Sequence, residues 1–204
     1  LDGRIATASG ASRWITGPQA RRAVHALRAS HDAVLVGAGT ARADNPDLRV
    51  RDLGVSHQPV RVVASRSLDL PLDSRLARSA RDVPLWLVHA QGDPAPWQAL
   101  GAQILAVPAE EAGLEPASML RALAARGITR VLCEGGGQLA ASLWRAGLVD
   151  RLVVFQAGLA LGADGRAGLG ALGIDALEAA PRLRLVDVQR LGGDVMQVWE
   201  RGAD

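Results

Sequence analysis

The stretch PASMLRALAARGITRVLCEGGGQLAASLWRAG, residues 116–147, decides the fold class. It opens with an amphipathic pattern that predicts a helix over Pro116–Arg126. The apolar run Arg130–Cys133 then predicts a buried strand, Gly135–Gly137 a tight turn, and Gln138–Ala146 a second helix. A helix, a strand, a glycine turn and another helix in this order are typical of an α/β fold with a parallel sheet.

Similar signals precede this stretch. The sequence Thr16-Gly17-Pro18 predicts a helix start, because Pro is favoured at the first helical position. Apolar residues at helical spacing follow it. The fully apolar run Ala33–Val36 then predicts a buried parallel strand, and three further strands are expected at Pro59–Val63, Leu85–Val88 and Gln103–Ala106.

The end of the chain changes character. Leu152–Phe155 predicts a strand, and the glycine-rich residues 158–173 predict a loop. Alternating patterns at 182–188 and 195–199 flank Gly192-Gly193, which indicates a hairpin. We expect this antiparallel ribbon to lie on the edge of the parallel sheet. No repeat or linker interrupts the chain, so we expect one domain over residues 1–204.

Composition fits a globular domain of ordinary size. The chain has 204 residues, of which 49% are hydrophobic and 22% charged, close to the globular average and enough for a substantial core. No apolar run approaches the ~18–20 residues of a membrane helix, and no signal peptide opens the sequence. Because the chain opens at Leu1 rather than Met, we expect a fragment of a longer protein with an incomplete first strand.

Charge and residue types argue against several other classes. The net charge is only +2, every basic residue is Arg, and aromatic residues make up 3%. The chain therefore lacks the basic stripe and stacking platforms of a nucleic-acid-binding protein. The single cysteine, Cys133, excludes an internal disulfide and predicts a cytoplasmic location. The four histidines show no zinc-ligand spacing, so we expect no metal.

The glycine turn is the best local signal for chemistry. Gly135–Gly137 between a strand end and a helix start would let the backbone approach an anion such as a diphosphate. An ordinary βα turn is the alternative, although three glycines are more than a turn needs. Glu134 precedes the turn at the carboxyl end of the strand, where ligands bind in open α/β sheets. It is either a group for proton transfer or substrate binding, or a solvated strand-end residue.

Other strand ends carry weaker signals. Gly37-Ala38-Gly39 begins a dinucleotide fingerprint, but Arg42 stands at the third glycine position and Pro46 blocks a longer helix, so we expect a structural turn. Ser65-Arg66 after another strand would suit the 2′-phosphate of NADPH, because Arg binds phosphate bidentately. Three arginines offer phosphate clamps if they converge: Arg28, Arg49 and Arg51.

Three stretches together resemble the reductase domain of riboflavin biosynthesis, part of a bifunctional deaminase/reductase family. They are LDGRIATASGASRWITGPQARRAVHALRASHDAVLVGAGTARADNPDLRVR (1–51), LCEGGGQLAASLWRAGLVDRLVV (132–154) and APRLRLVDVQRLGGDV (180–195). The resemblance implies a three-layer dihydrofolate-reductase-like fold with a mostly parallel central sheet and a C-terminal antiparallel hairpin. It also implies that NADPH reduces the ribosyl group of 5-amino-6-(5-phosphoribosylamino)uracil to the ribitylamino product.

Most of the candidate site, including Ser12, Trp14 and Leu48, is what the resemblance implies, and the residue pattern adds Arg66 and Gly135. The candidate cofactor-binding residues are Trp14, Thr40, Asp44, Ser65, Arg66, Gly135, Gly136, Gly137, Gln138, Leu139 and Ser142. The candidate substrate-binding residues are Ser12, Arg28, Leu48, Arg51 and Glu134. Glu134 and Asp44 are the candidate catalytic residues.

The sequence departs from the family in two places and leaves alternatives open. The family's lysine before the position of Leu1 lies outside this chain, and Ala64 stands where Asp is more usual. The family's zinc deaminase partner is absent from these residues, so the chain is either the excised half of a fused enzyme or a stand-alone reductase. The resemblance implies a homodimer. Rival functions are a pterin or folate reductase on the same scaffold and a nucleotide-binding domain without catalysis.

Overall fold

The computed structural model describes residues 1–111 and 113–202. The chain forms two compact units. The central unit is His25–Leu139, and the terminal unit combines Leu1–Val24 with Ala140–Asp204. Two helices cross the boundary: α1 is Pro18–Ala29 and α6 is Gly137–Arg145. The prediction of a single domain stays a prediction.

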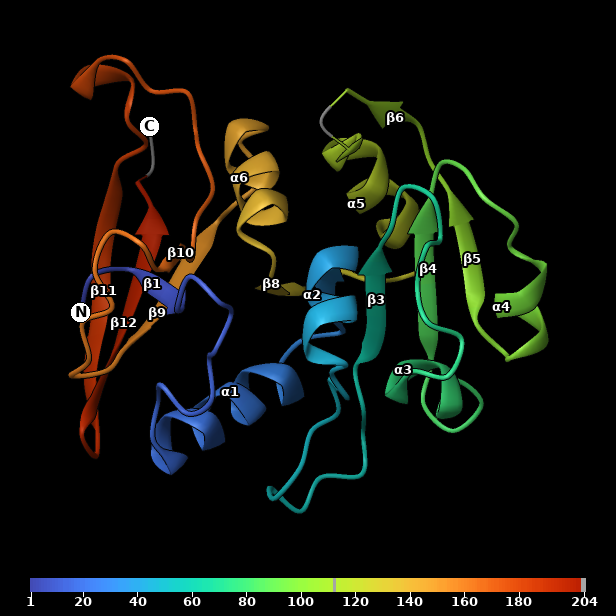
Figure 1. The fold of residues 1–204 in the computed structure, drawn as a ribbon, viewed down its shortest axis with the longest axis horizontal. Helices are drawn as coiled ribbons and strands as arrows, with labels where there is room; N and C mark the ends of the chain where they lie inside the picture. Colours follow the sequence, from blue (N-terminus) through green and yellow to red (C-terminus); the bar gives the residue numbers. More distant parts are fainter. Residues whose placement is uncertain (112, 203–204) are drawn as a thin grey trace. The chain divides into compact units, whose positions relative to one another are not determined.

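The central unit contains a five-stranded parallel sheet in the order β5-β4-β3-β2-β8 (Figure 1). Its strands are β2 (Ala33–Gly37), β3 (Val60–Ala64), β4 (Leu85–His89), β5 (Gln103–Ala106) and β8 (Val131–Gly135). Most residues of β2, β3 and β4 are buried, as expected for strands covered on both faces. The prediction of a mostly parallel α/β sheet is confirmed.

Helices connect these strands by crossovers. They are α2 (Ala38–Asp44), α3 (Arg75–Arg78), α4 (Ala95–Ala99) and α5 (Pro116–Ala124). The chain moves from β2 to β5 in one direction and returns past β2 to β8 in the other. Right-handed crossovers therefore place α2, α3 and α4 on one face of the sheet and α5 on the other. Short strands β6 (Ala109–Glu110) and β7 (Gly113–Leu114) pair before α5.

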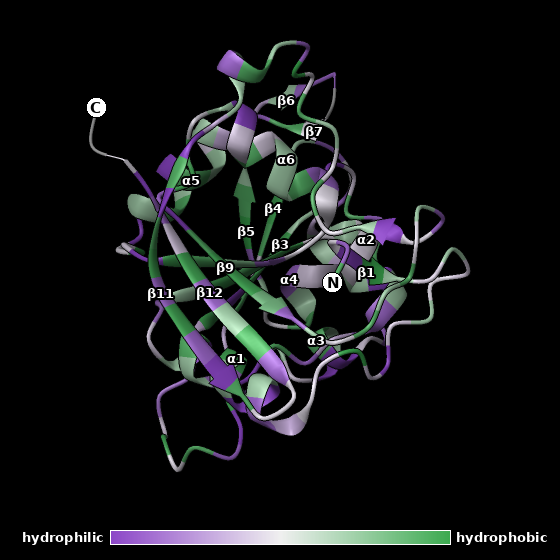
Figure 2. Ribbon diagram, turned by 90° about the vertical axis from the view of Figure 1, so that its left-hand side faces the viewer, coloured by the Kyte–Doolittle hydropathy of each residue, from purple (hydrophilic) through white to green (hydrophobic). Residues whose placement is uncertain are grey.

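The terminal unit contains a three-stranded antiparallel sheet in the order β11-β12-β9. Its strands are β9 (Arg151–Gln156), β11 (Leu183–Leu191) and β12 (Asp194–Arg201). Gly192 and Gly193 form the two-residue hairpin turn, since Leu191 pairs with Asp194. The predicted hairpin is confirmed, but its predicted place on the edge of the parallel sheet is wrong, because β12 pairs with β9. Polar and apolar residues mix along β11 and β12 (Figure 2).

Smaller elements complete the terminal unit. Strand β1 (Arg4–Ala6) pairs with β10 (Arg166–Ala167), and η1 (Leu177–Ala179) is a single 3-10 turn. Most of the predicted loop over residues 158–173 lacks regular structure, apart from β10. Among the described residues, no helix is long and apolar enough to cross a membrane.

Candidate active site

The site begins where the strand order of the central sheet reverses. Strands β2 and β8 are parallel neighbours, yet the chain leaves β2 toward β3 and reaches β8 from the far edge of the sheet. Their carboxyl ends therefore form a topological switch point, where open α/β sheets bind ligands. Helix α2 begins directly after β2, and α6 begins one residue after β8. The first amide N–H groups of both helices thus lie at this edge, where they favour an anion.

The sequence predicted that the three glycines form one tight turn, but the structure divides them between a strand, a connection and a helix. Gly135 is the last residue of β8, Gly137 is the first of α6, and Gly136 alone joins them. The φ of Gly136 is +90°, a conformation that L side chains rarely adopt. All three glycines are partly exposed, so the bend is open rather than covered by protein.

The residues after β2 are a helix instead of the expected structural turn. Helix α2 starts at Ala38 with Gly37 as its N-cap, and it ends at Asp44 before Asn45 and Pro46. Seven residues are too few for an apolar pattern to show helical periodicity, so no sequence pattern indicated this helix. Pro46 limits the helix as expected, since the residue before a proline disfavours the helical conformation.

Thr40 of α2 lies against the connection between β8 and α6. A Cβ atom at Gly135 would lie 2.9 Å from Cγ2 and 3.1 Å from Oγ1 of Thr40. A Cβ atom at Gly37 would lie 3.8 Å from Leu139 at the start of α6. Only glycine lets the backbone of β8 approach α2 this closely. Two helix starts, a hydroxyl and a partly exposed glycine backbone fit the diphosphate of a dinucleotide.

Glu134 lies on a β-bulge. In the ladder between β2 and β8, Leu35 pairs with Cys133 and Val36 pairs with Gly135, so Glu134 is the extra residue. A bulge changes the direction of the side chain it carries, and bulges are frequent beside active sites. No local sequence signal predicted this bulge.

Glu134 forms a two-bond ion pair with Arg28 of α1. Nε of Arg28 donates to Oε1 of Glu134 at 2.7 Å, and Nη2 donates to Oε2 at 2.5 Å. The two side chains are only 14% and 15% exposed. Nη1 of Arg28 donates to the carbonyl of Arg49 at 3.0 Å. The structure therefore joins two predicted substrate residues, Arg28 and Glu134, in one ion pair.

The remaining central-unit substrate residues lie on the segment after α2. Leu48 is 3% exposed and has a φ of +62°, whereas Arg51 and Asp44 are exposed. The predicted convergence of three arginines is only partial. Arg28 contacts the backbone of Arg49, but the Arg49 side chain binds Asp47 at 2.6 Å.

His25 of α1 is a neighbour that sequence reasoning missed. Its Nδ1 accepts the amide N–H of Arg51 at 3.3 Å. Burial lowers the pKa of His25, and the positive charges of Arg28 and Arg51 lower it further, against the opposing charges of Glu134 and Asp52. No spacing rule could have marked it, because its partners come from separate segments.

The two candidate residues after β3, Ser65 and Arg66, differ in exposure. Ser65 is 1% exposed and follows β3, whereas Arg66 is exposed. The Arg66 carbonyl accepts the amides of Ala90 and Gln91. Of the pair, Arg66 is the side chain offered to solvent.

Three predicted site residues belong to the terminal unit. Trp14 is 72% exposed, and the guanidinium carbon of Arg21 lies 4.5 Å from the centre of its ring. Ser12 and Ser142 are half-buried, the latter on α6. On α6 the central unit contributes Gln138, which is exposed, and Leu139, which is half-buried.

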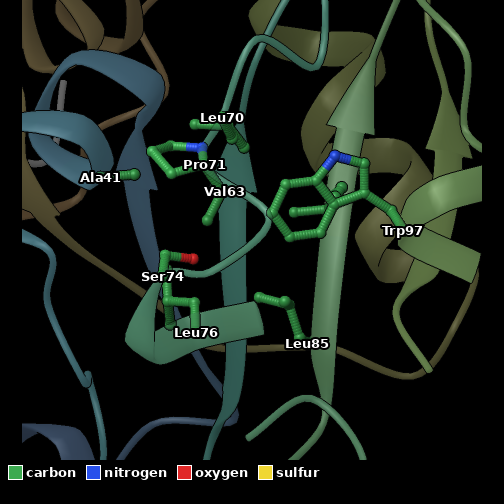
Figure 3. Close-up of a pocket in the computed structure, with 9 residues that line it drawn as sticks. Ala41, Val63, Leu70, Pro71, Ser74, Leu76, Leu85 and Trp97 are labelled. Carbon is green, nitrogen blue, oxygen red and sulfur yellow. The ribbon is translucent and has the colours of Figure 1, made fainter. Parts of the chain in front are cut away.

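An apolar cavity elsewhere in the central unit is no rival to this site. It is lined by Ala41, Val63, Leu70, Pro71, Ser74, Leu76, Leu85, Leu87 and Trp97 (Figure 3). Its one hydroxyl side chain, Ser74, already accepts the amide of Ala77 as a helix cap. Several of the lining residues belong to the hydrophobic core, so the cavity is a packing space. Within residues 1–111 and 113–202, no cluster of His, Cys, Asp and Glu could hold a metal ion.

Comparison with other proteins places the chain in a family. The family model described as "RibD C-terminal domain" matches residues 1–197. The riboflavin biosynthesis protein RibD of Escherichia coli is 33% identical over an alignment of 205 positions, which covers 96% of this chain and 56% of that protein. The chain spans about half the length of the curated relatives it matches.

Solved structures agree. RibD of Acinetobacter baumannii superposes with a TM-score of 0.85 at 30% identity, over 100% of this chain and 56% of that one. A Thermotoga maritima protein, titled a diaminohydroxyphosphoribosylaminopyrimidine deaminase/5-amino-6-(5-phosphoribosylamino)uracil reductase, gives a TM-score of 0.79 at 26% identity, over 99% and 54%. The fold is therefore dihydrofolate-reductase-like, as the resemblance implied. On this agreement of sequence and structure, the chain belongs to the RibD C-terminal domain family.

Proposed function

We propose that this chain uses NADPH to reduce the ribosyl group of 5-amino-6-(5-phosphoribosylamino)uracil to a ribitylamino group in riboflavin biosynthesis. Membership of the RibD C-terminal domain family supports a reductase. The Thermotoga maritima protein is described as a reductase of this substrate. The relatives from Escherichia coli and Aquifex aeolicus are both called riboflavin biosynthesis proteins.

The observation that carries the proposal is the glycine junction at the switch point. Gly135 and Gly136 lie beside Thr40, and the first turns of α2 and α6 begin at the same sheet edge. Amide N–H groups of these turns and the Thr40 hydroxyl would hold the diphosphate. We assign Arg66, the exposed residue after β3, to the 2′-phosphate, where a guanidinium would favour NADPH over NADH.

NADPH, when bound, supplies a hydride to the first carbon of the opened sugar. This chain's residues would orient that carbon and exclude water. Arg28 fixes the Glu134 carboxylate at the bulge, where Glu134 would hold a polar group of the substrate. Arg51, which is exposed, would bind the sugar phosphate. Asp44, exposed at the end of α2, would contact the nicotinamide side.

Arg51 favours this phosphorylated substrate over a pterin or folate. Folate offers a guanidinium only its glutamate carboxylates, whereas the phosphoribosylaminouracil offers a sugar phosphate, which Arg binds bidentately. The test follows loss of NADPH absorbance with the phosphoribosylaminouracil and with dihydrofolate in parallel. Turnover of the first alone is expected. Turnover of dihydrofolate alone would overturn the choice of substrate, and NADPH binding without turnover of either would support a non-catalytic nucleotide-binding domain.

We also propose the family's assembly for this chain. Its relatives are about twice its length, which supports a single reductase domain joined to, or working with, a zinc deaminase. We propose a homodimer, in which edge strand β11 is the candidate for cover by a second copy. Analytical ultracentrifugation that finds only monomers would contradict the dimer.

A further inference from the structure

The segment from Asn45 to Arg51 is held in an unusual backbone conformation. Asn45 and Leu48 have φ values of +42° and +62°. Leu48 is also 3% exposed. It is therefore a bulky, buried residue whose backbone adopts the left-handed conformation. Such a residue costs of order 1–3 kcal/mol and persists only where its surroundings enforce it. The segment carries two of the candidate substrate residues, so what enforces it bears on the site.

Asp47 is the centre of the contacts that enforce this conformation. Its Oδ1 accepts Nε of Arg49 at 2.6 Å, and its Oδ2 accepts Nη2 of Arg49 at 3.0 Å and Nη2 of Arg75 at 3.1 Å. Asp47 is 7% exposed, whereas the arginine side chains are 40% and 50% exposed. Burial raises the pKa of Asp47, but the Arg49 hydrogen bond and the charges of Arg49, Arg75 and Arg51 outweigh it and hold this pKa below its usual value.

The Asp47–Arg49 pair spans Leu48 and so closes a short ring across the strained residue. Arg75 fixes the start of the segment, because its own amide also donates to Oδ1 of Asn45 at 2.8 Å. Gln58 fixes the end, where it binds the amide of Val50 at 2.7 Å and its carbonyl at 3.2 Å. Side chains from α3 and from the segment before β3 thus clamp residues 45–50.

The same segment reaches Glu134 through Arg28. The Arg49 carbonyl accepts Nη1 of Arg28, and the other two donor groups of Arg28 bind Glu134. Arg28 therefore has one fixed acceptor on the clamped segment and one on the β8 bulge. If the segment moved, the guanidinium plane and the Glu134 carboxylate would turn with it.

We propose that Asp47 is a positioning residue for the reduction proposed above: by clamping Arg49 and Arg75 it fixes the Arg49 carbonyl, which orients Arg28 and hence Glu134. This inference rests on the proposed function. It gives a role to a buried carboxylate that touches no candidate ligand. A role in stability alone would leave the properties of Glu134 untouched, which makes the two roles separable.

The test is a double-mutant cycle between Asp47→Asn and Glu134→Gln in the purified protein, assayed well below the melting temperature of every variant. Asp47→Asn is expected to lower kcat/KM for the phosphoribosylaminouracil by roughly 3- to 30-fold, while the Kd for NADPH stays within about twofold. In the Glu134→Gln background the same change should cost less than about twofold, because the residue it acts through is already altered. Asp47→Glu should restore part of the loss.

The matched control is Asp73→Asn. Asp73 is 84% exposed and reaches Arg78 only at 4.0 Å, so its removal should leave kcat/KM unchanged. Equal losses from Asp47→Asn in both backgrounds, or a lower melting temperature with unaltered kcat/KM, would overturn the positioning role.

A second measurement, which needs no turnover, tests the clamp separately from the proposed function. Amide hydrogen exchange at Leu48, Val50 and Arg51, measured without substrate, should be faster in Asp47→Asn. A wild-type protein without turnover would contradict the proposed reaction only. Unchanged exchange at these amides would overturn the clamp whatever the activity.

Discussion

At the scale of single residues, chemistry at this site depends on pairs that come from distant parts of the sequence. Arg28 and Glu134 are separated by 106 positions and share two hydrogen bonds. The sequence predicted both residues as substrate contacts through a family resemblance. It could not predict that each is the other's partner, because a charge pattern carries no information about which segments meet.

The Glu134 carboxylate should matter to turnover more than to cofactor binding. Glu134→Gln is expected to lower kcat/KM at least ~10-fold, a loss of ~1.4 kcal/mol in transition-state stabilisation. The amide keeps the size but loses the charge that Arg28 orients. Steady-state kinetics with a circular-dichroism check of folding would measure it. Exposed Glu178→Gln is the control, and an equal loss there, or none at Glu134, contradicts the assigned role.

His25 should make stability depend on pH. Its pKa in the folded protein lies below its ordinary value, so the unfolded chain binds a proton first as pH falls. Stability is therefore full above about pH 6.5 and declines below it, until the folded state is protonated too. Protonation at Nδ1 also removes the acceptor for the Arg51 amide.

The corresponding measurement is the melting temperature from roughly pH 5 to 8. His25→Gln should flatten the decline on the acid side, whereas exposed His57→Gln should keep the wild-type slope. An identical acid-side slope in wild type and His25→Gln would show that another group is responsible.

At the scale of elements, the strands were easier to predict than the connections. β2, β3, β4, β5 and β8 appear within a residue or two of their predicted bounds, because buried parallel strands are short continuous apolar runs. Helices α3 and α4 were not predicted, since four or five residues show no period. The bulge at Glu134 and the left-handed Leu48 were also missed, because packing around them decides their conformation.

The close approach of β8 and α2 should be sensitive to one methyl group. In Gly135→Ala the new Cβ would lie 2.9 Å from Cγ2 of Thr40, and a β-branched side chain has little freedom to move. We expect weaker NADPH binding, by about tenfold or ~1.4 kcal/mol, measured by fluorescence titration. Adding Thr40→Ser removes Cγ2, keeps the hydroxyl, and should restore much of the affinity.

Gly193→Ala provides the comparison, because a Cβ at Gly193 would meet nothing within 4 Å. The steric account fails if Gly135→Ala binds NADPH like wild type, or if Thr40→Ser brings no recovery.

The protein should lose stability when the Trp97 side chain is removed from the core on the face of the sheet that carries α2, α3 and α4. Trp97 is 3% exposed and lines the apolar cavity in Figure 3. Trp97→Ala enlarges that space and should lower the free energy of unfolding by roughly 3–5 kcal/mol. Urea denaturation measures it, with Leu177→Ala, 73% exposed, as the control. A loss below about 1 kcal/mol would contradict the view that this cavity is part of a packed core.

At the scale of the whole molecule, sequence pattern gave the α/β class and the C-terminal hairpin, and the resemblance gave the family. The pairing partner of the hairpin was missed, because alternation in β11 and β12 does not say that β9 lies beside them. The glycines marked the right place in the chain. What made that place a candidate site was topology, since only the strand order reveals that β2 and β8 meet where the sheet reverses.

The most direct test of this account is to map NADPH on the protein by amide chemical shifts. If the switch point holds the diphosphate, the largest shifts will fall at Ala38–Thr40 and Gly136–Gln138, and in Gly135→Ala the same shifts will need about tenfold more NADPH to appear. Large shifts confined to other parts of the chain, with these two helix starts unmoved at saturating NADPH, would contradict it.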